Sequence, residues 1–469
     1  MATGTKDRKK LKDFVLTQVN ERNIDFIRLQ FVDILGTLKC CTVTRRGLED
    51  TLDDGVFFDG SSVEGFVRIF ESDMYLLPDP STFSVIPWSD EHAEARIICD
   101  VRDPDGGPFP GDPRHIIQKQ MDRAEKLGLR YLIGAELEFF LFKKDGALAG
   151  QPPRPHDPGG YFDMDPLDHA MNIKKKAVML MEAMGERIEL VNGKPIVKKG
   201  IVIEMSHHEV AAGQHEIDFK YSSALTIADA ITTYKYVMKR IASENGLHAS
   251  FMPKPLFGVN GSGMHTNQSL WNIKKGRNAF YDGKDRYQLS ALAKNFLGGQ
   301  LKHARALAGV LDPTVNSYKR LTPGYEAPVY ICWGTNNRSA LIRVPRTSQK
   351  KRSATRLELR CPDASCNPYL AFAAMLAAGL DGVENKIEPP KPVEEDVYKF
   401  EDRKLKRFYI KTLPADLGEA MQELKKSKLL KEQLGELAHT KLLAAQQRQW
   451  DEYRIQVTPW ELATYYDQI

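Results

Sequence analysis

The stretch EMSHHEVAAGQHE, residues 204–216, gathers three carboxylates and three histidines into thirteen positions. It follows the apolar run IVI at 201–203, which predicts that at least one face is buried. A buried carboxylate without a counter-charge is costly or becomes protonated, so this density of acids favours a site for a hard divalent cation. The alternative is the exposed polar end of a strand.

Length and composition predict a globular chain, which we expect to bind neither nucleic acid nor a membrane. The 469 residues are 42% hydrophobic, enough for two or three domains. The 66 basic residues nearly balance the 62 acidic ones, a formal net charge of +4. The basic run at 346–356 is the exception, and it also fits a solvated loop.

The sequence favours a cytoplasmic location. No apolar segment of a secretory signal follows the charged N-terminus, and the longest apolar run, 370–380, is much shorter than the ~20 residues of a membrane span. The six cysteines form no CxxC pair, which suits reduced thiols.

Residue patterns predict two domains, at 1–110 and 111–469, because the proline- and glycine-rich segment 103–114 is typical of a boundary. Before the boundary we expect a helix at 8–21, a hairpin at 25–43 and strands at 84–88 and 95–101. Beyond it we expect helices at 115–127, 167–184 and 222–246, a hairpin about the Asn-Gly turn at 187–198, and a largely helical region at 415–450.

A second acidic pair lies in the apolar run RYLIGAELEFFLF, residues 130–142. Alternate side chains of a strand share a face, so Glu136 and Glu138 project together while Leu137 faces the other way. This pair also favours a cation, although an exposed strand face is the alternative.

Two further stretches place polar side chains on strand faces. In FGVNGSGMHTNQSLW, 257–271, a glycine turn precedes His265, Asn267 and Ser269 on one side; an ordinary hairpin turn is the alternative. In TRLELR, 355–360, one face carries Arg356, Glu358 and Arg360; the alternative is a surface ion-pair ladder.

Together these clusters indicate phosphoryl transfer. Carboxylate ligands suit Mg²⁺ or Mn²⁺ better than a structural zinc ion. Two such cations combined with arginines are typical of phosphoryl transfer, and no Walker A or kinase glycine loop is present.

Six motifs, in order along the chain, carry a resemblance to type I glutamine synthetases. They are FDGSS at 58–62, AELEFF at 135–140, HHEVAAGQHE at 207–216, NGSGMH at 260–265, NSYKRLTPGYEAP at 316–328 and NRSALIR at 337–343. The resemblance implies an α+β fold, with an N-terminal β-grasp domain and a C-terminal glutamine synthetase/guanido kinase-like catalytic α/β domain. It also implies a dodecamer of two stacked hexameric rings, in which a neighbouring subunit contributes FDGSS to each active site.

The resemblance also implies roles for individual residues. Two Mg²⁺ or Mn²⁺ ions would be held, the first by Glu138, Glu209 and Glu216 and the second by Glu136, His265 and Glu358. ATP would meet Glu204, His207, Asn267, Ser269, Arg338, Arg343 and Arg356. Glutamate would meet Asn260, Gly261, His265, Arg320 and Arg360.

The implied reaction has two steps. The γ-carboxylate of glutamate attacks the γ-phosphate of ATP, and Arg338 stabilises the transferring group. Ammonium then binds near Asp59 and Ser62, loses a proton to Asp59 and attacks the γ-glutamyl phosphate. Glu326 would act as a flap against water.

The sequence departs from the family at several points. Asn267 stands where some members have His, the run at 346–356 is about two residues longer than expected, and the hairpin at 187–198 resembles an insertion. Either Lys350 or Lys351 would then meet the nucleotide. Arg68, in GFVRIFESDM, resembles the sensing position of the branch inhibited by glutamine, with nitrogen-regulatory proteins as candidate partners, and we expect no adenylylation at Tyr398.

Two other functions compete with ammonia ligation. A γ-glutamyl-amine ligase would use the same phosphate route, but an anionic pocket with Asp59 and Glu326 suits a small cation better. A catalytically inactive relative with a structural or regulatory role would be expected to have lost some of the ligands and arginines, all of which are present.

Overall fold

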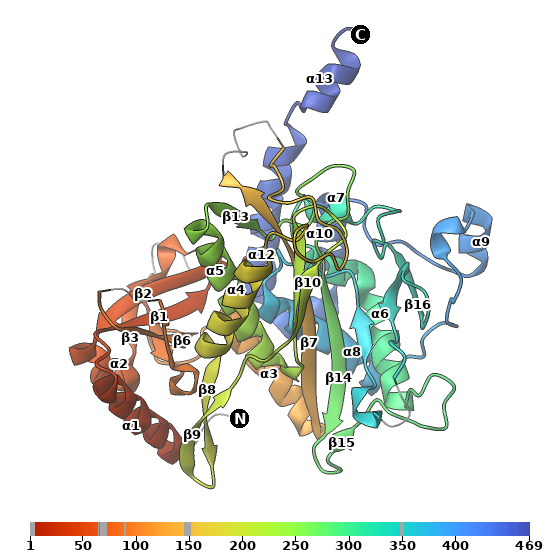
Figure 1. Ribbon diagram of the computed structural model, residues 1–469. Helices are drawn as coiled ribbons and strands as arrows, with labels where there is room; N and C mark the ends of the chain where they lie inside the picture. The colour runs from red at the N-terminus through yellow and green to blue at the C-terminus, as the bar shows by residue number, and fades with distance from the viewer. Residues whose placement is uncertain (1–4, 64, 66–72, 89–90, 145–151, 348–350) are drawn as a thin grey trace.

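The computed structural model describes residues 5–63, 65, 73–88, 91–144, 152–347 and 351–469. Figure 1 shows a smaller N-terminal part, coloured red to orange, beside a larger body built on a long sheet, with the C-terminal helix extending away from that body. Within the described ranges, no helix is long and apolar enough to cross a membrane.

The N-terminal sheet has the strand order β2-β1-β6-β4-β3, with β5 paired to β6. Strand β1 pairs antiparallel with β2 and parallel with β6. Helix α1 buries Leu11, Val15 and Val19, which repeat at helical spacing, in the core of this sheet. The elements are α1 (Thr5–Glu21), β1 (Phe26–Val32), β2 (Leu38–Thr44), α2 (Leu48–Asp54), β3 (Val56–Asp59), β4 (Asp73–Pro78), β5 (Ser84–Val85) and β6 (Glu94–Arg102).

The larger sheet has the order β10-β11-β7-β14-β18-β17-β16, and β7 is its longest described strand. β7 pairs antiparallel with β11, β12, β13 and β14, whereas β16 and β17 run parallel. The strands are β7 (Leu129–Lys143), β10 (Ile203–His208), β11 (Gln214–Phe219), β12 (Ser222–Ser223), β13 (Leu247–Ser250), β14 (Met264–Asn272), β15 (Arg277–Asn278), β16 (Tyr330–Gly334), β17 (Ala340–Arg343) and β18 (Leu357–Leu359).

Helices α3 and α5 contact β7, and α8 packs against α3, α5 and α6. α6 and α8 approach closely, because a Cβ on Gly299 would lie only 2.2 Å from the carbonyl oxygen of Ala378. The helices are α3 (Pro113–Lys126), α4 (Met171–Met184), α5 (Ala224–Glu244), α6 (Ala291–Leu311), α7 (Ser317–Arg320), α8 (Pro368–Glu384), α9 (Asp402–Arg407), α10 (Leu417–Lys426), α11 (Lys428–Leu434), α12 (Glu436–Arg454) and α13 (Pro459–Tyr465).

A separate hairpin of β8 (Glu186–Val191) and β9 (Lys194–Lys199) joins the two parts. Its turn residues Asn192 and Gly193 both have positive φ, as a tight hairpin requires. Ile188 enters the N-terminal core, while the guanidinium of Arg187 lies 3.0 Å from the carboxylate of Asp229 on α5. The predicted hairpin at 187–198 is therefore confirmed, and it bridges the domains.

Most predicted elements are confirmed to within a few residues, including the hairpin at 25–43 and the helix at 222–246, but three differ in a way that has a local cause. The strand expected at 84–88 stops at Val85 because Pro87 has no N–H for a ladder. The helix expected from 167 begins at Met171, after Asp168 accepts a hydrogen bond from the backbone N–H of Ala170. The region 415–450 forms three successive helices, since a Ser cap and a glycine of positive φ interrupt it.

Candidate active site

A first group of acids spans three neighbouring strands of the larger sheet. His207 of β10 is paired in register with Glu216 of β11, which is paired with Glu138 of β7. His207 Nε2 lies 3.3 Å from the carboxylate of Glu216, and its Nδ1 lies 3.6 Å from that of Glu209. Glu138 accepts a hydrogen bond of 3.0 Å from Gln214 Nε2. The strand register thus brings the two acidic stretches of the sequence together.

A second group is formed by residues of β7, β14 and β18. Glu136 of β7 is paired with His265 of β14, and one ligand atom from each of Glu136, His265 and Glu358 lies within 4.8 Å of the others. Asn267 Nδ2 donates to the carboxylate of Glu136 at 2.7 Å. Because His265 and Asn267 alternate with buried residues, they share a face of β14, as predicted.

Arginines surround the second group. Glu358 is only 1% exposed, and it accepts hydrogen bonds from Arg343 Nε at 2.6 Å and Arg360 Nη1 at 2.8 Å. β18 comprises only Leu357–Leu359, so Arg360 projects from just beyond the strand. Arg320 is buried and donates to the backbone carbonyl oxygens of Arg360 and Cys361, which fixes its guanidinium beside the acids.

The NGSG turn is packed too tightly for larger residues. A Cβ on Gly261 would lie 2.3 Å from the carbonyl oxygen of Pro253, and one on Gly263 would lie 2.5 Å from Arg320 Nη2. The N–H of Gly263 donates to the carboxylate of Glu138 at 3.0 Å. The glycines therefore let the backbone approach both the arginine and the first acidic group.

Two cavities meet at Glu136. The smaller, of about 360 Å³, is lined by both acidic groups except His207, together with Asn260, Gly261, Arg320, Glu326, Arg338, Arg343 and Arg360. The larger, of about 650 Å³, is lined by Glu136, Glu204, Asp218, Asn267, Ser269, Lys351 and Arg356, among others. Between them, the cavities collect most of the residues that the sequence assigned to glutamate and to ATP.

Burial is the largest cause of the pKa shifts in and around these groups. It raises the pKa of Glu216 well above its ordinary value, with Glu138 the next cause, and it also raises the pKa values of Glu138 and Glu209. The pKa of Asp218 is raised to about 8 by burial and by Glu136. Burial and then Arg360 lower the pKa of His265 to about 3, which keeps the imidazole neutral.

These groups fit hard divalent cations. Each offers carboxylate oxygens and one imidazole nitrogen, and Asp218 Oδ1 is buried without a hydrogen-bond partner. Like charges that raise one another's pKa values are stabilised by a positive ion placed among them. Oxygen-rich sets of this kind suit Mg²⁺ or Mn²⁺.

Several predicted residues lie apart from the cavities. Asp59 and Ser62 are exposed and line neither cavity, and Asp59 accepts a hydrogen bond of 2.8 Å from the backbone N–H of Ser61. The side chain of Ser61 and then its backbone N–H lower the pKa of Asp59 through hydrogen bonding. Arg68 and Lys350 lie outside the described residues.

The rim of the smaller cavity carries the TPGYE segment. Gly324, Tyr325 and Glu326 all have positive φ, an uncommon run for residues with side chains. Glu326 lies 3.7 Å from the guanidinium of Arg338, and both side chains are exposed. The half-buried hydroxyl of Tyr398 donates to the carbonyl oxygen of Ala327 in the same segment.

The structure adds residues that the sequence did not single out. Gln214 and Asp218 lie on the same face of β11 as Glu216, two positions to either side, and both contribute to the cavities. Tyr161 lines the smaller cavity and packs its ring edge-on against His207. Strand alternation pointed to Gln214 and Asp218, whereas nothing local in the sequence pointed to Tyr161.

Comparison with known families agrees with this geometry. The model of the glutamine synthetase catalytic domain matches residues 110–465, and the model of the glutamine synthetase β-grasp domain matches residues 23–104. The chain belongs to the glutamine synthetase family. The predicted fold, a β-grasp domain followed by a catalytic domain of the glutamine synthetase family, is confirmed.

Individual relatives align over nearly the whole chain. The glutamine synthetase of Methanosarcina mazei is 50% identical over 455 residues, covering 97% of each chain. That of Thermotoga maritima is 50% identical over 449 residues, covering 95% of this chain and 97% of its own. Among solved structures, the cryo-EM Plasmodium falciparum glutamine synthetase has a TM-score of 0.85 at 26% identity over 98% of both chains. A GmaS/ADP complex has a TM-score of 0.84 at 31% identity, covering 97% of this chain and 99% of its own.

Proposed function

We propose that this protein ligates ammonia to L-glutamate in an ATP-dependent reaction, giving L-glutamine, ADP and phosphate through γ-glutamyl phosphate. The observation that carries this proposal is the meeting of two cavities at Glu136, with two acid-histidine groups and a set of arginines at the junction. Full-length similarity to glutamine synthetases supports it.

The two acidic groups are the proposed cation ligands. Glu138, Glu209 and Glu216 hold one ion, and Glu136, His265 and Glu358 hold the other, as Mg²⁺ or Mn²⁺. The raised pKa values of Glu138, Glu209 and Glu216, caused mainly by burial, support the assignment of the first ion. When bound, these ions offset the negative charge of the ATP phosphates and of the transferring phosphoryl group.

The larger cavity is the proposed nucleotide site. Its volume of about 650 Å³ and its mixed lining, with Phe219 and Tyr221 as well as Lys351 and Arg356, suit ATP. Arg356 Nε donates to Asn267 Oδ1 at 2.8 Å, so these two side chains form an ordered edge. The proposed nucleotide contacts are Glu204, His207, Asn267, Ser269, Arg338, Arg343, Lys351 and Arg356.

The smaller cavity is the proposed glutamate site, with contacts from Asn260, Gly261, His265, Arg320 and Arg360. In the first step, an oxygen of the glutamate γ-carboxylate attacks the γ-phosphorus of ATP and ADP leaves. Arg338 and Arg343 border this cavity and stabilise the charge on the transferring phosphoryl group.

The second step uses residues from a neighbouring subunit. Asp59 and Ser62 bind ammonium, Asp59 accepts a proton, and ammonia attacks the acyl phosphate to release phosphate. The exposure of both residues, away from the cavities of their own chain, supports a contribution to the site of a neighbour in a dodecamer of two hexameric rings. The strained turn at Glu326 supports its role as the flap that excludes water.

Two alternatives are less well supported. A γ-glutamyl-amine ligase needs room for a larger amine, whereas Glu326 and a neighbour's Asp59 would place two carboxylates around a small cation. An inactive relative is disfavoured because two cavities that share Glu136 are lined by the predicted ligands and arginines of the catalytic domain. His207 is the exception, and it lies beside Glu209 and Glu216.

Phosphate release separates these functions. Purified protein with ATP, Mg²⁺ and glutamate should release phosphate when ammonium is added, and much less with methylamine, ethanolamine or putrescine at the same concentration. The Glu216→Gln variant serves as a control for contaminating ATPases. A response to an amine and not to ammonium would establish the amine ligase, and no response to either would indicate an inactive relative.

Four further assignments belong to this proposal. The domain boundary lies at 110/111, supported by the end of β6 at Arg102 and the start of α3 at Pro113. The protein works in the cytoplasm, which its six free cysteines support. Arg68 senses glutamine, and nitrogen-regulatory proteins are the candidate partners.

A further inference from the structure

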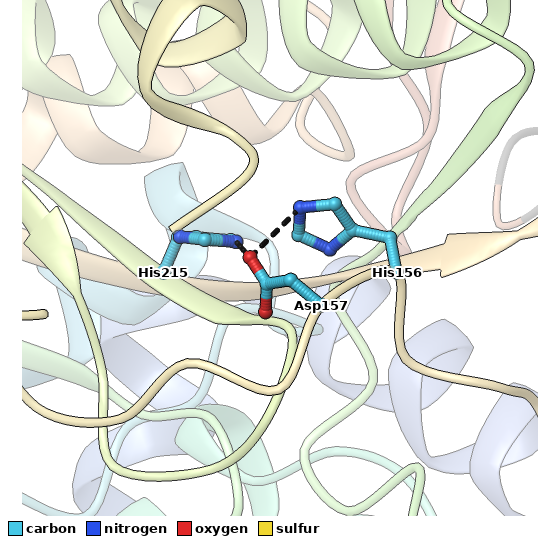
Figure 2. A group of neighbouring side chains, drawn as sticks. All are labelled: His156, Asp157 and His215. Atoms are coloured by element: carbon cyan, nitrogen blue, oxygen red, sulfur yellow. Dashed lines mark ion pairs between the residues drawn. The ribbon is translucent and has the colours of Figure 1, made fainter. Parts of the chain in front are cut away.

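A buried histidine cluster lies behind the first acidic group. His208 of β10 and His215 of β11 are paired in register and fully buried. Successive side chains of a strand face opposite sides, so these histidines point away from His207 and Glu216. Figure 2 shows Asp157, from the loop before α4, directed toward His156 and His215.

The carboxylate of Asp157 connects this cluster to the turn between β10 and β11. Its Oδ1 accepts a hydrogen bond from the backbone N–H of Gly213 at 3.0 Å and lies 3.0 Å from His208 Nε2. Its Oδ2 accepts from the backbone N–H of His169 at 3.1 Å. One buried side chain therefore ties the turn to the loop before α4.

The same turn carries the proposed ligand Glu209. His208 Nδ1 lies 2.7 Å from the carbonyl oxygen of Glu209, and the N–H of Glu209 donates to the carbonyl oxygen of Gln214. Gly213 has a φ of 69°, and a Cβ there would lie 2.9 Å from the carbonyl oxygen of Leu141, so the turn is held close to β7. Any displacement of Gly213 or His208 would move Glu209 relative to Glu216.

His156, Asp157 and His215 also have the spacing of a metal site, but Lys174 argues against one. Lys174 Nζ lies 3.3 Å from His215 Nδ1 and 2.6 Å from the carboxylate of Asp168. An ammonium group only donates hydrogen bonds, so His215 Nδ1 accepts and the ring proton is on Nε2. Nε2 then points its N–H toward Asp157 and has no lone pair for a metal.

We propose that Asp157 is a positioning residue that, through Gly213 and His208, sets the spacing of Glu209 and Glu216 for a divalent cation. This inference rests on the cation site of the proposed function. Groups behind the direct ligands typically change metal affinity 10- to 100-fold when they are altered, roughly the effect expected here.

Binding of Mn²⁺ tests the proposal without turnover. Free Mn²⁺ is measured by electron paramagnetic resonance during titration of the intact, metal-free assembly, with no nucleotide or glutamate. Asp157→Asn presents an amide N–H where the carboxylate accepted hydrogen bonds, and it should raise the dissociation constant of one class of Mn²⁺ sites about 10-fold or more. The second class should change little.

Two further variants separate positioning from general destabilisation. His208→Gln keeps an N–H donor toward Asp157 and should retain near-native Mn²⁺ affinity, whereas His208→Ala should lose affinity as Asp157→Asn does. Asp229→Asn is the matched control, because Asp229 is a buried carboxylate bonded to Arg114, Arg187 and Tyr369. It should lower the melting temperature and leave Mn²⁺ binding unchanged.

Unchanged Mn²⁺ affinity in a folded Asp157→Asn protein would overturn the proposal, as would an equal loss in Asp229→Asn. A tightly held zinc ion that disappears in His156→Ala would replace it with a metal site. If Asp157→Asn weakens Mn²⁺ binding while the unaltered protein makes no glutamine, the positioning role stands and the proposed reaction fails.

Discussion

Removal of the divalent cations should make the protein progressively less stable as the pH rises from about 4 to about 8. Asp218 is 9% exposed, and burial followed by Glu136 raises its pKa from 3.8 to about 8. In this window the folded protein keeps a proton that the unfolded chain releases. The folded state therefore binds more protons, and its stability falls with increasing pH.

The size of this effect follows from the pKa shift. The rise in the pKa of Asp218 from 3.8 to about 8 is roughly four pKa units. At 1.36 kcal/mol per unit, this group alone lowers the free energy of unfolding by roughly 5 kcal/mol between about pH 4 and about pH 8. The pKa values of Glu138, Glu209 and Glu216 are raised as well. A cation at about 100 times its dissociation constant restores about 2.7 kcal/mol per site.

Thermal unfolding measures this balance. Melting temperatures are compared at pH 5, 6, 7 and 8, at one protein concentration, with EDTA or with MgCl₂. The difference in melting temperature between the EDTA and MgCl₂ samples should increase as the pH rises. Asp218→Asn removes one titrating group and should reduce this difference. If the EDTA sample is as stable at pH 8 as at pH 5 and Mg²⁺ adds nothing, the cation-site reasoning is refuted.

Three other changes separate the roles of the site and the scaffold. Asp59→Ala should raise the ammonium requirement steeply while sparing glutamate-dependent phosphorylation of the substrate, measured by trapping with hydroxylamine; equal loss of both steps would contradict its role. Gly261→Ala should lower glutamate affinity at least 10-fold in binding assays, because its Cβ would meet the carbonyl oxygen of Pro253 at 2.3 Å; native affinity would show that the turn tolerates a side chain. Arg114→Met should cost about 3–5 kcal/mol in denaturant unfolding, since this 2% exposed residue pairs with three carboxylates. The exposed Arg454→Met is its control, and similar losses in both would count against the buried network.

Features set by local spacing could be predicted from the sequence. Glu136 and Glu138 share a strand face, as do His265 and Asn267, because side chains alternate along any strand. The Asn-Gly turn of the β8–β9 hairpin follows equally from local conformational preference.

Features set by pairing between distant segments of the chain could not be predicted from the sequence. The register that places Glu216 beside Glu138 pairs β11 with β7, a strand from a distant part of the sequence. Asp157 comes from a proline- and glycine-rich loop without a periodic pattern, yet its carboxylate holds the turn after β10. Such contacts appear only once the chain is folded.

Activation of the glutamate side-chain carboxylate by ATP is tested most directly by following oxygen. Glutamate labelled with ¹⁸O in its γ-carboxylate is incubated with the protein, ATP, Mg²⁺ and ¹⁵N-ammonium, and the products are analysed by mass spectrometry. We expect one ¹⁸O atom in each released phosphate and ¹⁵N in the side-chain amide of glutamine. Phosphate free of ¹⁸O, or no labelled glutamine, would contradict a γ-glutamyl phosphate route at this site.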